Sequence, residues 1–130
     1  MVDLSTLFNA AKRVHQLAYA PYSNFKVGTA LQTDSGEIFT GCNVENAAYP
    51  IGTFAEAGAI AAMIAAGRKH ITHIMIIGTG TKPCFPCGAC RQRIAEFGDA
   101  QTQIYVGSTT GYLPKAFTIA ELLPHSFELT

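Results

Sequence analysis

The segment 53–66 places the strongest constraint on how this chain of 130 residues folds, because small side chains fill most of it. Eight of its fourteen residues are alanine or glycine, so the helix predicted here carries little side-chain bulk. Other backbone elements can therefore approach it closely on several sides. We expect this helix to lie centrally, with Thr53 as its N-cap, Glu56 in the position of a capping-box partner and Gly67 at its end.

Helical and strand patterns alternate along the rest of the chain. Apolar residues recur at helical spacing from residue 4 to 18, which predicts an amphipathic helix that ends before Pro21. The apolar stretches 27–31 and 38–42 flank a turn signal at 33–36 and predict a β-hairpin. Further elements are expected as strands at 71–77 and 103–106 and as helices at about 88–97 and 119–123.

This order of elements indicates an α/β protein. Strands that alternate with helices after an opening hairpin favour a three-layer α/β/α sandwich on a mixed sheet of about five strands. No linker, repeat or low-complexity tract divides the sequence, so we expect residues 1–130 to form a single domain. Hydrophobic residues make up 48% of the chain, which is enough for one sizeable core.

The charge balance argues against polyanionic partners. Nine Lys and Arg residues balance nine Asp and Glu residues, so no net field attracts the chain to nucleic acid or to an acidic membrane. The sequence also lacks a signal peptide and any apolar stretch near the ~20 residues that span a bilayer, and we expect a cytoplasmic protein. Its low charge density leaves apolar surface to bury, which favours an oligomer.

Three of the four cysteines, Cys84, Cys87 and Cys90, lie within seven residues. Such clustering is typical of metal ligands or reactive thiols in a reducing compartment. Cys87 and Cys90 stand at a predicted helix start, where backbone N–H groups stabilise thiolates, and their spacing suits Zn²⁺. A redox pair or two buried cysteines are the alternatives. Arg91 follows them, and its guanidinium would reduce repulsion between the thiolates unless it is an ordinary surface residue.

Glu56 lies in the first turn of the small-residue helix, 31 positions before Cys87. A carboxylate that is buried next to a metal-bound water can act as a general base and then as a general acid. The alternative interpretation is a glutamate that only caps its helix.

These residues belong to a longer pattern. Ala55-Glu56, the stretch from Pro86 to Gln92 and the upstream stretch 41–50 occur here in the order found in zinc nucleoside deaminases. Together with 21–28 and 122–127, they make nearly the whole chain similar to the small homotetrameric cytidine deaminases. The resemblance implies hydrolytic deamination of cytidine and 2'-deoxycytidine to uridine and 2'-deoxyuridine in pyrimidine salvage.

The resemblance also implies roles for individual residues. Cys87 and Cys90 would hold one zinc ion per subunit, and Glu56 would shuttle protons between the attacking water, N3 of the pyrimidine and the leaving ammonia. The residues that would bind the nucleoside are Phe25, Asn43, Glu45, Tyr49, Ala55 and Phe127, with Tyr49 in a loop that reaches a neighbouring subunit's site. Without the resemblance, Asn43 and Glu45 could equally serve turns or helix capping, and the two phenylalanines would be assigned to the core.

One position departs from the family's pattern. The residue two before the catalytic glutamate is a zinc-ligating cysteine in that pattern, and here it is Phe54, which has no donor atom and is bulkier than a thiol. The arginine that follows the glutamate in many relatives is Ala57. Cys84 can replace the ligand only if the chain folds back against the extended preference of Phe85 before Pro86; otherwise it is a buried or surface thiol.

Two other functions therefore stay open. Because Phe54 removes a ligand, the alternative to an active deaminase is a zinc-impaired nucleoside-binding pseudoenzyme or an engineered inactive form. A polynucleotide-editing deaminase is less favoured, since the net charge is zero and Asn43 and Glu45 suit a free ribose. Cys42 is expected to pack as a small hydrophobe, and the four histidines show no ligand-like spacing to the cysteine cluster.

Overall fold

The structure, a computed structural model, describes residues 3–110 and 114–129. In these ranges five strands form one sheet in the order β2-β1-β3-β4-β5. The strands are β1 (Val27–Thr33), β2 (Ile38–Cys42), β3 (Ile71–Gly78), β4 (Gln103–Ser108) and β5 (Lys115–Thr118). β3 and β4 pair in parallel and the other neighbours pair antiparallel. The expected mixed sheet of five strands is confirmed.

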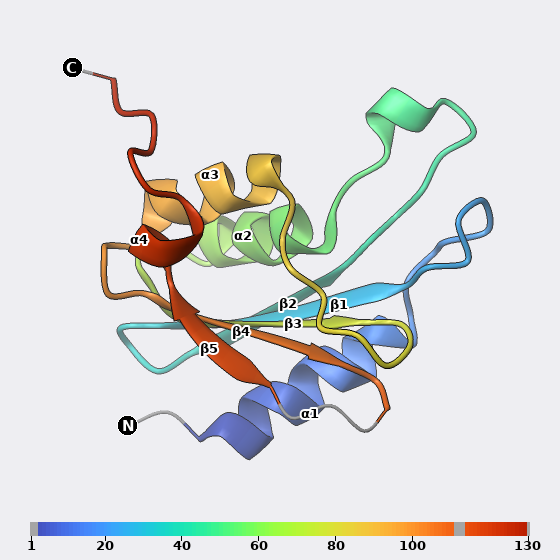
Figure 1. The fold of residues 1–130 in the computed structure, drawn as a ribbon, viewed down its shortest axis with the longest axis horizontal. Coiled ribbons are helices and arrows are strands. Elements are labelled where there is room, and N and C mark those ends of the chain that lie inside the picture. The colour runs from blue at the N-terminus through green and yellow to red at the C-terminus, as the bar shows by residue number, and fades with distance from the viewer. Residues whose placement is uncertain (1–2, 111–113, 130) are drawn as a thin grey trace.

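Helices cover both faces of this sheet (Figure 1). They are α1 (Leu4–His15) on one face and α2 (Ala55–Ala65), α3 (Gly88–Phe97) and α4 (Ile119–Leu122) on the other. Alternate side chains of β3 supply the two cores: Ile74 and Ile76 pack toward α2 and α3, whereas Met75 and Ile77 pack toward α1. The three-layer α/β/α sandwich is therefore confirmed. None of the helices in the described ranges is long and apolar enough to cross a bilayer.

Local sequence signals account for the first elements. α1 begins after Asp3, whose carboxylate accepts hydrogen bonds from the backbone amides of Ser5 and Thr6. β1 and β2 form the expected hairpin, and Gly36 occupies its turn at a φ of 88°, a conformation that glycine adopts without strain.

The start of α2 differs from the prediction. Its N-cap is Phe54, not Thr53, and no side chain caps it. The backbone N–H and C=O of Thr53 instead pair with Val44, at 2.9 and 3.0 Å, in an isolated antiparallel bridge. This tertiary pairing holds Thr53 in an extended conformation. Glu56 therefore forms no capping box, and its carboxylate is buried.

The small residues of α2 allow the close approach that the sequence predicts, but on one side only. β2 crosses the helix so closely that a Cβ atom on Gly41 would collide with the backbone nitrogen of Ala59. The opposite side of the helix carries the exposed residues Ala61, Ala62, Ile64 and Ala65. In the single chain α2 thus lies on one face of the sheet and is not central.

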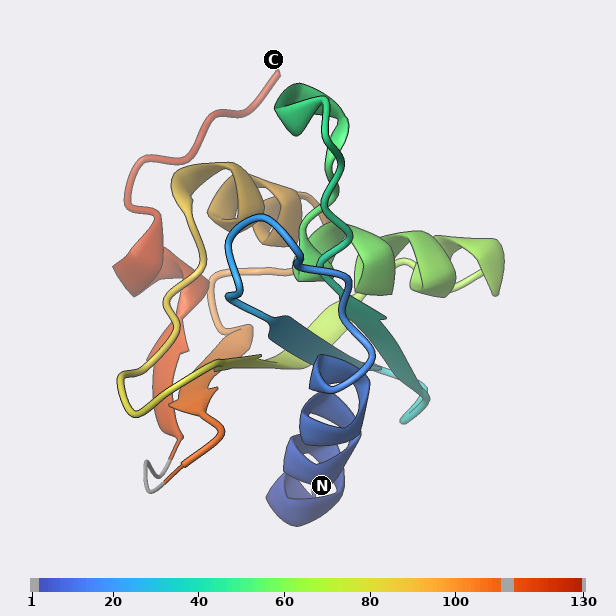
Figure 2. The ribbon, with the colours of Figure 1, turned by 90° about the vertical axis from the view of Figure 1, so that its right-hand side faces the viewer.

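Residues 43–54 leave the body of the protein as an arm (Figure 2). The bridge between Val44 and Thr53 closes its base, and a short 3₁₀ helix, η1 (Tyr49–Ile51), forms its tip. At this tip the side chain of Tyr49 is 75% exposed. The arm connects β2 to α2 and therefore separates Asn43 and Glu45 from Glu56 along the chain.

Candidate active site

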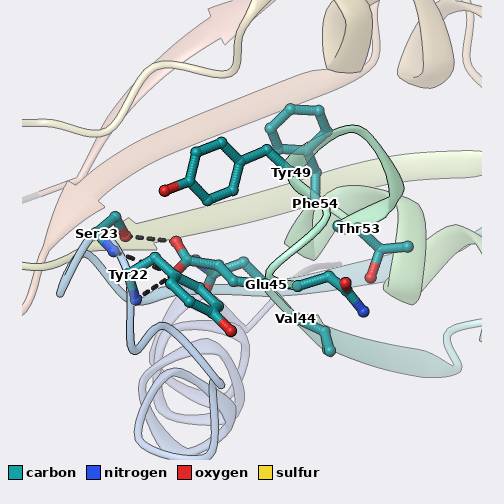
Figure 3. Close-up of a pocket in the computed structure, with 10 residues that line it drawn as sticks. Tyr22, Ser23, Val44, Glu45, Tyr49, Thr53 and Phe54 are labelled. Carbon is teal, nitrogen blue, oxygen red and sulfur yellow. Dashed lines mark hydrogen bonds between the residues drawn. The ribbon is translucent and has the colours of Figure 1, made fainter.

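A cavity of about 380 Å³ opens between the base of the arm and the segment that follows α1 (Figure 3). Three of the residues predicted to bind substrate, Asn43, Glu45 and Tyr49, line it. The remaining walls come from Tyr22, Ser23, Val44, Asn46, Gly52, Thr53 and Phe54. The cavity is comparable in volume to pockets that take small-molecule ligands.

Glu45 is held in the cavity wall by the turn at Tyr22 and Ser23 (Figure 3). The two backbone amides donate to one carboxylate oxygen, at 3.0 and 3.1 Å, and the Ser23 hydroxyl donates to the other. These bonds, that of the hydroxyl foremost, lower the pKa of Glu45 and keep it ionised. A carboxylate accepts about four hydrogen bonds, so Glu45 can still accept one from a ligand. Sequence reasoning did not find this anchoring role of Tyr22 and Ser23, although both lie in the stretch 21–28 that contributed to the resemblance.

Asn43 ties the end of β2 to the start of β1. Its Oδ1 atom accepts from the backbone amide of Val27 at 2.8 Å, and its Nδ2 atom donates to the carbonyl of Phe25 at 2.9 Å. One N–H and one lone pair of the amide group remain for a ligand. Asn43 therefore shapes the cavity wall and can also offer a polar group.

The two aromatic residues of the prediction lie outside the cavity wall. Phe25 follows the Tyr22–Ser23 turn and is 43% exposed. Phe127 is 71% exposed, and its backbone carbonyl accepts a hydrogen bond from Gln92 of α3 at 3.1 Å. Their contact with a pyrimidine stays a prediction.

The first turns of α2 and α3 bring Glu56 to the paired cysteines. Glu56 is 5% exposed and Cys90 is fully buried, whereas Cys87, the N-cap of α3, is exposed. Burial raises the pKa of Glu56, while the neighbouring Cys90 thiol and the charge of Arg93 oppose that rise. Burial also raises the pKa of Cys90, and the negative charges of Glu56 and Cys87 add to the effect. Ala55, which precedes Glu56, is buried in the same turn.

This donor set does not complete the three-ligand site that is usual for catalytic zinc. Phe54 has no donor atom, and within residues 3–110 and 114–129 no group of three His, Cys, Asp or Glu side chains is arranged to hold a metal ion. All four cysteines are free thiols. Cys84 packs against Gly78 and the core under α2, where burial raises its pKa to about 11. It therefore does not replace the missing ligand.

The arginine next to the thiols is Arg93, not Arg91. Arg91 donates to the backbone carbonyls of Pro86 and Leu122, both at 2.8 Å, and ties α3 to the preceding loop and to α4. The Nη1 atom of Arg93 lies 3.4 Å from Sγ of Cys90. The expectation for Arg91 is not met, and the spacing of three residues between Cys90 and Arg93 on one helix face is the signal that could have identified Arg93.

Comparison with known proteins gives a consistent result. The family model for the cytidine and deoxycytidylate deaminase zinc-binding region matches residues 1–106. The cytidine deaminase of Halalkalibacterium halodurans is 37% identical, over 97% of this chain and 95% of its own length, and that of Sporosarcina psychrophila is 36% identical, over 97% and 92%. The crystal structure of cytidine deaminase from Burkholderia pseudomallei aligns with a TM-score of 0.91 and 40% identity, over 97% of this chain and 100% of that chain. Matches of this extent in both sequence and fold show that the chain belongs to the cytidine and deoxycytidylate deaminase family of zinc-dependent enzymes.

Proposed function

We propose that this chain deaminates cytidine and 2'-deoxycytidine to uridine and 2'-deoxyuridine in pyrimidine salvage. The observation that carries the proposal is the buried carboxyl group of Glu56, held next to the Cys90 thiol two residues after the cavity-lining Phe54. Relatives that span nearly the same length are cytidine deaminases, which supports this choice of substrate.

Glu56 carries the protons in the proposed reaction. The oxygen of a water molecule bonds to C4 of the cytosine ring, and the bond between C4 and the exocyclic nitrogen breaks, so that ammonia leaves. Glu56 takes one proton from the water and gives it to N3, and it later delivers the second to the leaving amino group. Because burial raises the pKa of Glu56, its carboxylate is a stronger base than an exposed glutamate.

The polar groups left over in the cavity wall suit the ribose of the substrate. Glu45 can accept a hydrogen bond from one hydroxyl, and Asn43 can donate to or accept from its neighbour. In this proposal Phe25 and Phe127 provide flat apolar faces for the pyrimidine, while Ala55 and Tyr49 border the bound nucleoside.

We also infer a cytoplasmic homotetramer with shared active sites, in which residues 1–130 form one domain. The exposed side of α2 and the projecting arm support the assembly, because both present apolar surface at the outside of the single chain. The balance of nine basic and nine acidic residues supports a free nucleoside, not nucleic acid or a membrane, as the partner.

A zinc-impaired nucleoside-binding protein is the second candidate. The observation that favours it is Phe54, which leaves the two thiols of Cys87 and Cys90 without a third donor among the residues that the structure describes. The hydrogen bonds that hold Glu45 and Asn43 in the cavity wall involve none of these thiols, so the cavity does not require the metal.

Turnover and binding, measured on one preparation, separate the two functions. An active deaminase converts cytidine to uridine with release of ammonia, and the loss of cytidine absorbance stops in Glu56→Gln. A binding protein gives a cytidine titration signal by calorimetry without product. A chain that neither binds nor converts cytidine would contradict both.

A further inference from the structure

Arg93 makes a set of contacts that the proposed reaction does not use. Its Nη1 atom donates to Sγ of Cys90 at 3.4 Å, and its guanidinium carbon lies 5.5 Å from the centre of the Phe54 ring. Its charge also acts on the carboxyl group of Glu56. One half-buried guanidinium group thus interacts with an aromatic ring, a thiol and a carboxyl group.

The Phe54 ring, the Cys90 thiol and the Glu56 carboxyl group each favour a positive charge at the position of the Arg93 guanidinium group. The face of an aromatic ring attracts a cation, and sulfur and carboxylate oxygen accept hydrogen bonds from a guanidinium. A zinc ion at the paired cysteines would need the same Cys90 sulfur and would face the charge of Arg93 at short range. Two cations that compete for one partner repel each other, so the contact of Arg93 with Cys90 opposes metal binding.

We propose that the pair formed by Phe54 and Arg93 takes the place of the zinc ion in this chain. Arg93 supplies the positive charge beside Cys90, and Phe54, at the position of the third ligand, holds the guanidinium group there. Cys87 and Cys90 then hold no stoichiometric zinc, and the fold does not depend on the metal. This inference favours the second candidate function above, the zinc-impaired nucleoside-binding protein, and its test measures zinc content and melting temperature without an assay of turnover.

The test compares the parent protein with Phe54→Cys, Arg93→Met and the double variant. Each protein is produced with added zinc, freed of loose metal by gel filtration and analysed for zinc by mass spectrometry. Zinc affinity is then measured by competition with a chelating dye, and the melting temperature is measured with and without chelator. Arg68→Met is the matched control, because Arg68 pairs with Glu37 and follows α2 at the end remote from Glu56.

We expect the parent and Arg68→Met to contain far less than one zinc per chain and to melt at a temperature that the chelator does not change. Phe54→Cys gains zinc, and its melting temperature falls when the chelator is added. The double variant binds zinc roughly tenfold more tightly than Phe54→Cys, since no guanidinium competes for the Cys90 sulfur or repels the ion.

Two results would overturn the proposal. Stoichiometric zinc in the parent would show that the paired cysteines hold the metal despite Phe54. An equal or weaker affinity in the double variant than in Phe54→Cys would make Arg93 a supporting partner of a metal-bound thiolate, whose loss costs roughly 10- to 100-fold in affinity. If Arg93→Met does not fold, Arg93→Gln is compared in the same way in the Phe54→Cys background, with the same two outcomes.

Discussion

The structure shifts the pKa values of two glutamates, Glu45 and Glu56, in opposite directions. Glu45 is kept ionised by the Ser23 hydroxyl and two backbone amides, whereas burial shifts the pKa of Glu56 upward. A carboxylate whose pKa is lowered suits the binding of hydroxyl groups, and a raised pKa suits a group that takes up and returns protons. The two glutamates therefore fit different tasks in the proposed reaction.

Replacement of Glu56 by Gln should abolish deamination with little loss of stability. The amide is nearly isosteric but cannot carry a proton, so we expect turnover to fall by roughly 10²- to 10⁴-fold. Steady-state assays with cytidine measure the rate, and circular dichroism melting checks the fold. Glu45→Gln is the control, with a weaker apparent affinity for cytidine and a much smaller loss of maximal rate. A parent-like rate in Glu56→Gln would remove Glu56 from the mechanism.

The resemblance, more than residue type and spacing alone, predicted that Glu56 lies near the paired cysteines, and it did not predict the contact of Arg93 with Cys90. A buried acid in one helix turn and two cysteines in another share a recognisable pattern, and the fold brings them together. The anchoring of Glu45 by Tyr22 and Ser23 could not be read in this way, because it joins positions more than twenty residues apart through backbone amides. Every residue type except proline offers a backbone N–H, so residue type gives no signal.

At the scale of the elements, helix α2 and strand β2 pack so closely that their backbones are in contact. Gly41 of the strand and Gly58 of the helix face each other there, and a Cβ atom on Gly58 would lie 3.5 Å from the Cα of Gly41. The two glycines differ in the room around them, since a Cβ on Gly41 would strike the helix backbone itself. The contact holds α2 tightly against β2.

The substitutions Gly41→Ala and Gly58→Ala should have opposite effects on stability. Gly41→Ala forces the strand away from the helix, which costs about 1–3 kcal/mol or more. Gly58→Ala places a methyl group in ordinary van der Waals contact and removes a helix-interior glycine, which gains up to about 1 kcal/mol. Urea denaturation of both variants measures the free energies of unfolding. Equal effects of the two would show that the helix and strand are not in close contact.

The last residue of α1 makes stability depend on pH. His15 is buried, with its Nε2 atom 3.0 Å from the Thr79 hydroxyl, and burial lowers its pKa. The unfolded chain therefore binds the proton first as the pH falls through about 6.5. The stability that neutral His15 provides is complete above that pH and declines below it.

We expect the free energy of unfolding to fall less between pH 7.5 and 5.5 in His15→Gln than in the parent. Urea denaturation at both pH values checks this. The pKa of His73 is also lowered by burial, so part of the pH dependence should persist in the variant. An unchanged pH dependence would mean that His15 binds its proton equally in the folded and unfolded states.

The types of the predicted elements followed from periodicity, but several boundaries did not, and β5 had no predicted range; the start of α2 is the clearest case. Thr53 has the usual chemistry of an N-cap, and the helix nevertheless starts after Phe54. The reason is the pairing of the Thr53 backbone with Val44, which is set by the course of the arm. Here the backbone pairing with Val44 outweighs the local N-cap preference of Thr53. The helix therefore starts one residue later than the sequence predicts.

On the scale of the whole molecule, the part of the chain that the structure describes exposes apolar surface on the outer side of α2 and on the arm, among other places. Helices cover both faces of the sheet, so the three-layer core is complete without a partner. The layers could be predicted from the order of elements, because helices that alternate with strands must lie on the sheet faces. The packing between the proposed subunits could not be predicted, because the sequence of one chain does not indicate which of its surfaces contact each other in an assembly.

Sedimentation equilibrium should show a homotetramer at micromolar concentration. The expectation rests on the exposed small residues of α2 and on the apolar tip of the arm, which contains Tyr49 and Ile51. Replacing Ala62 by Glu on the outer side of α2 should shift the protein toward smaller species without changing the fold of the monomer. A parent protein that stays monomeric would contradict both the assembly and the shared sites.

Tyr49 lines the cavity although it lies at the tip of the arm, which projects from the body of the single chain. In the shared arrangement proposed above, a neighbouring chain supports this wall of the cavity. The wall is therefore complete only while the subunits are associated. The rate per mole of chain then declines as the protein is diluted, with no change in the chemistry of Glu56. Because the nucleoside binds the assembled form, saturating cytidine shifts the equilibrium toward assembly and reduces this loss of rate. Dilution therefore lowers the rate most at low cytidine concentration.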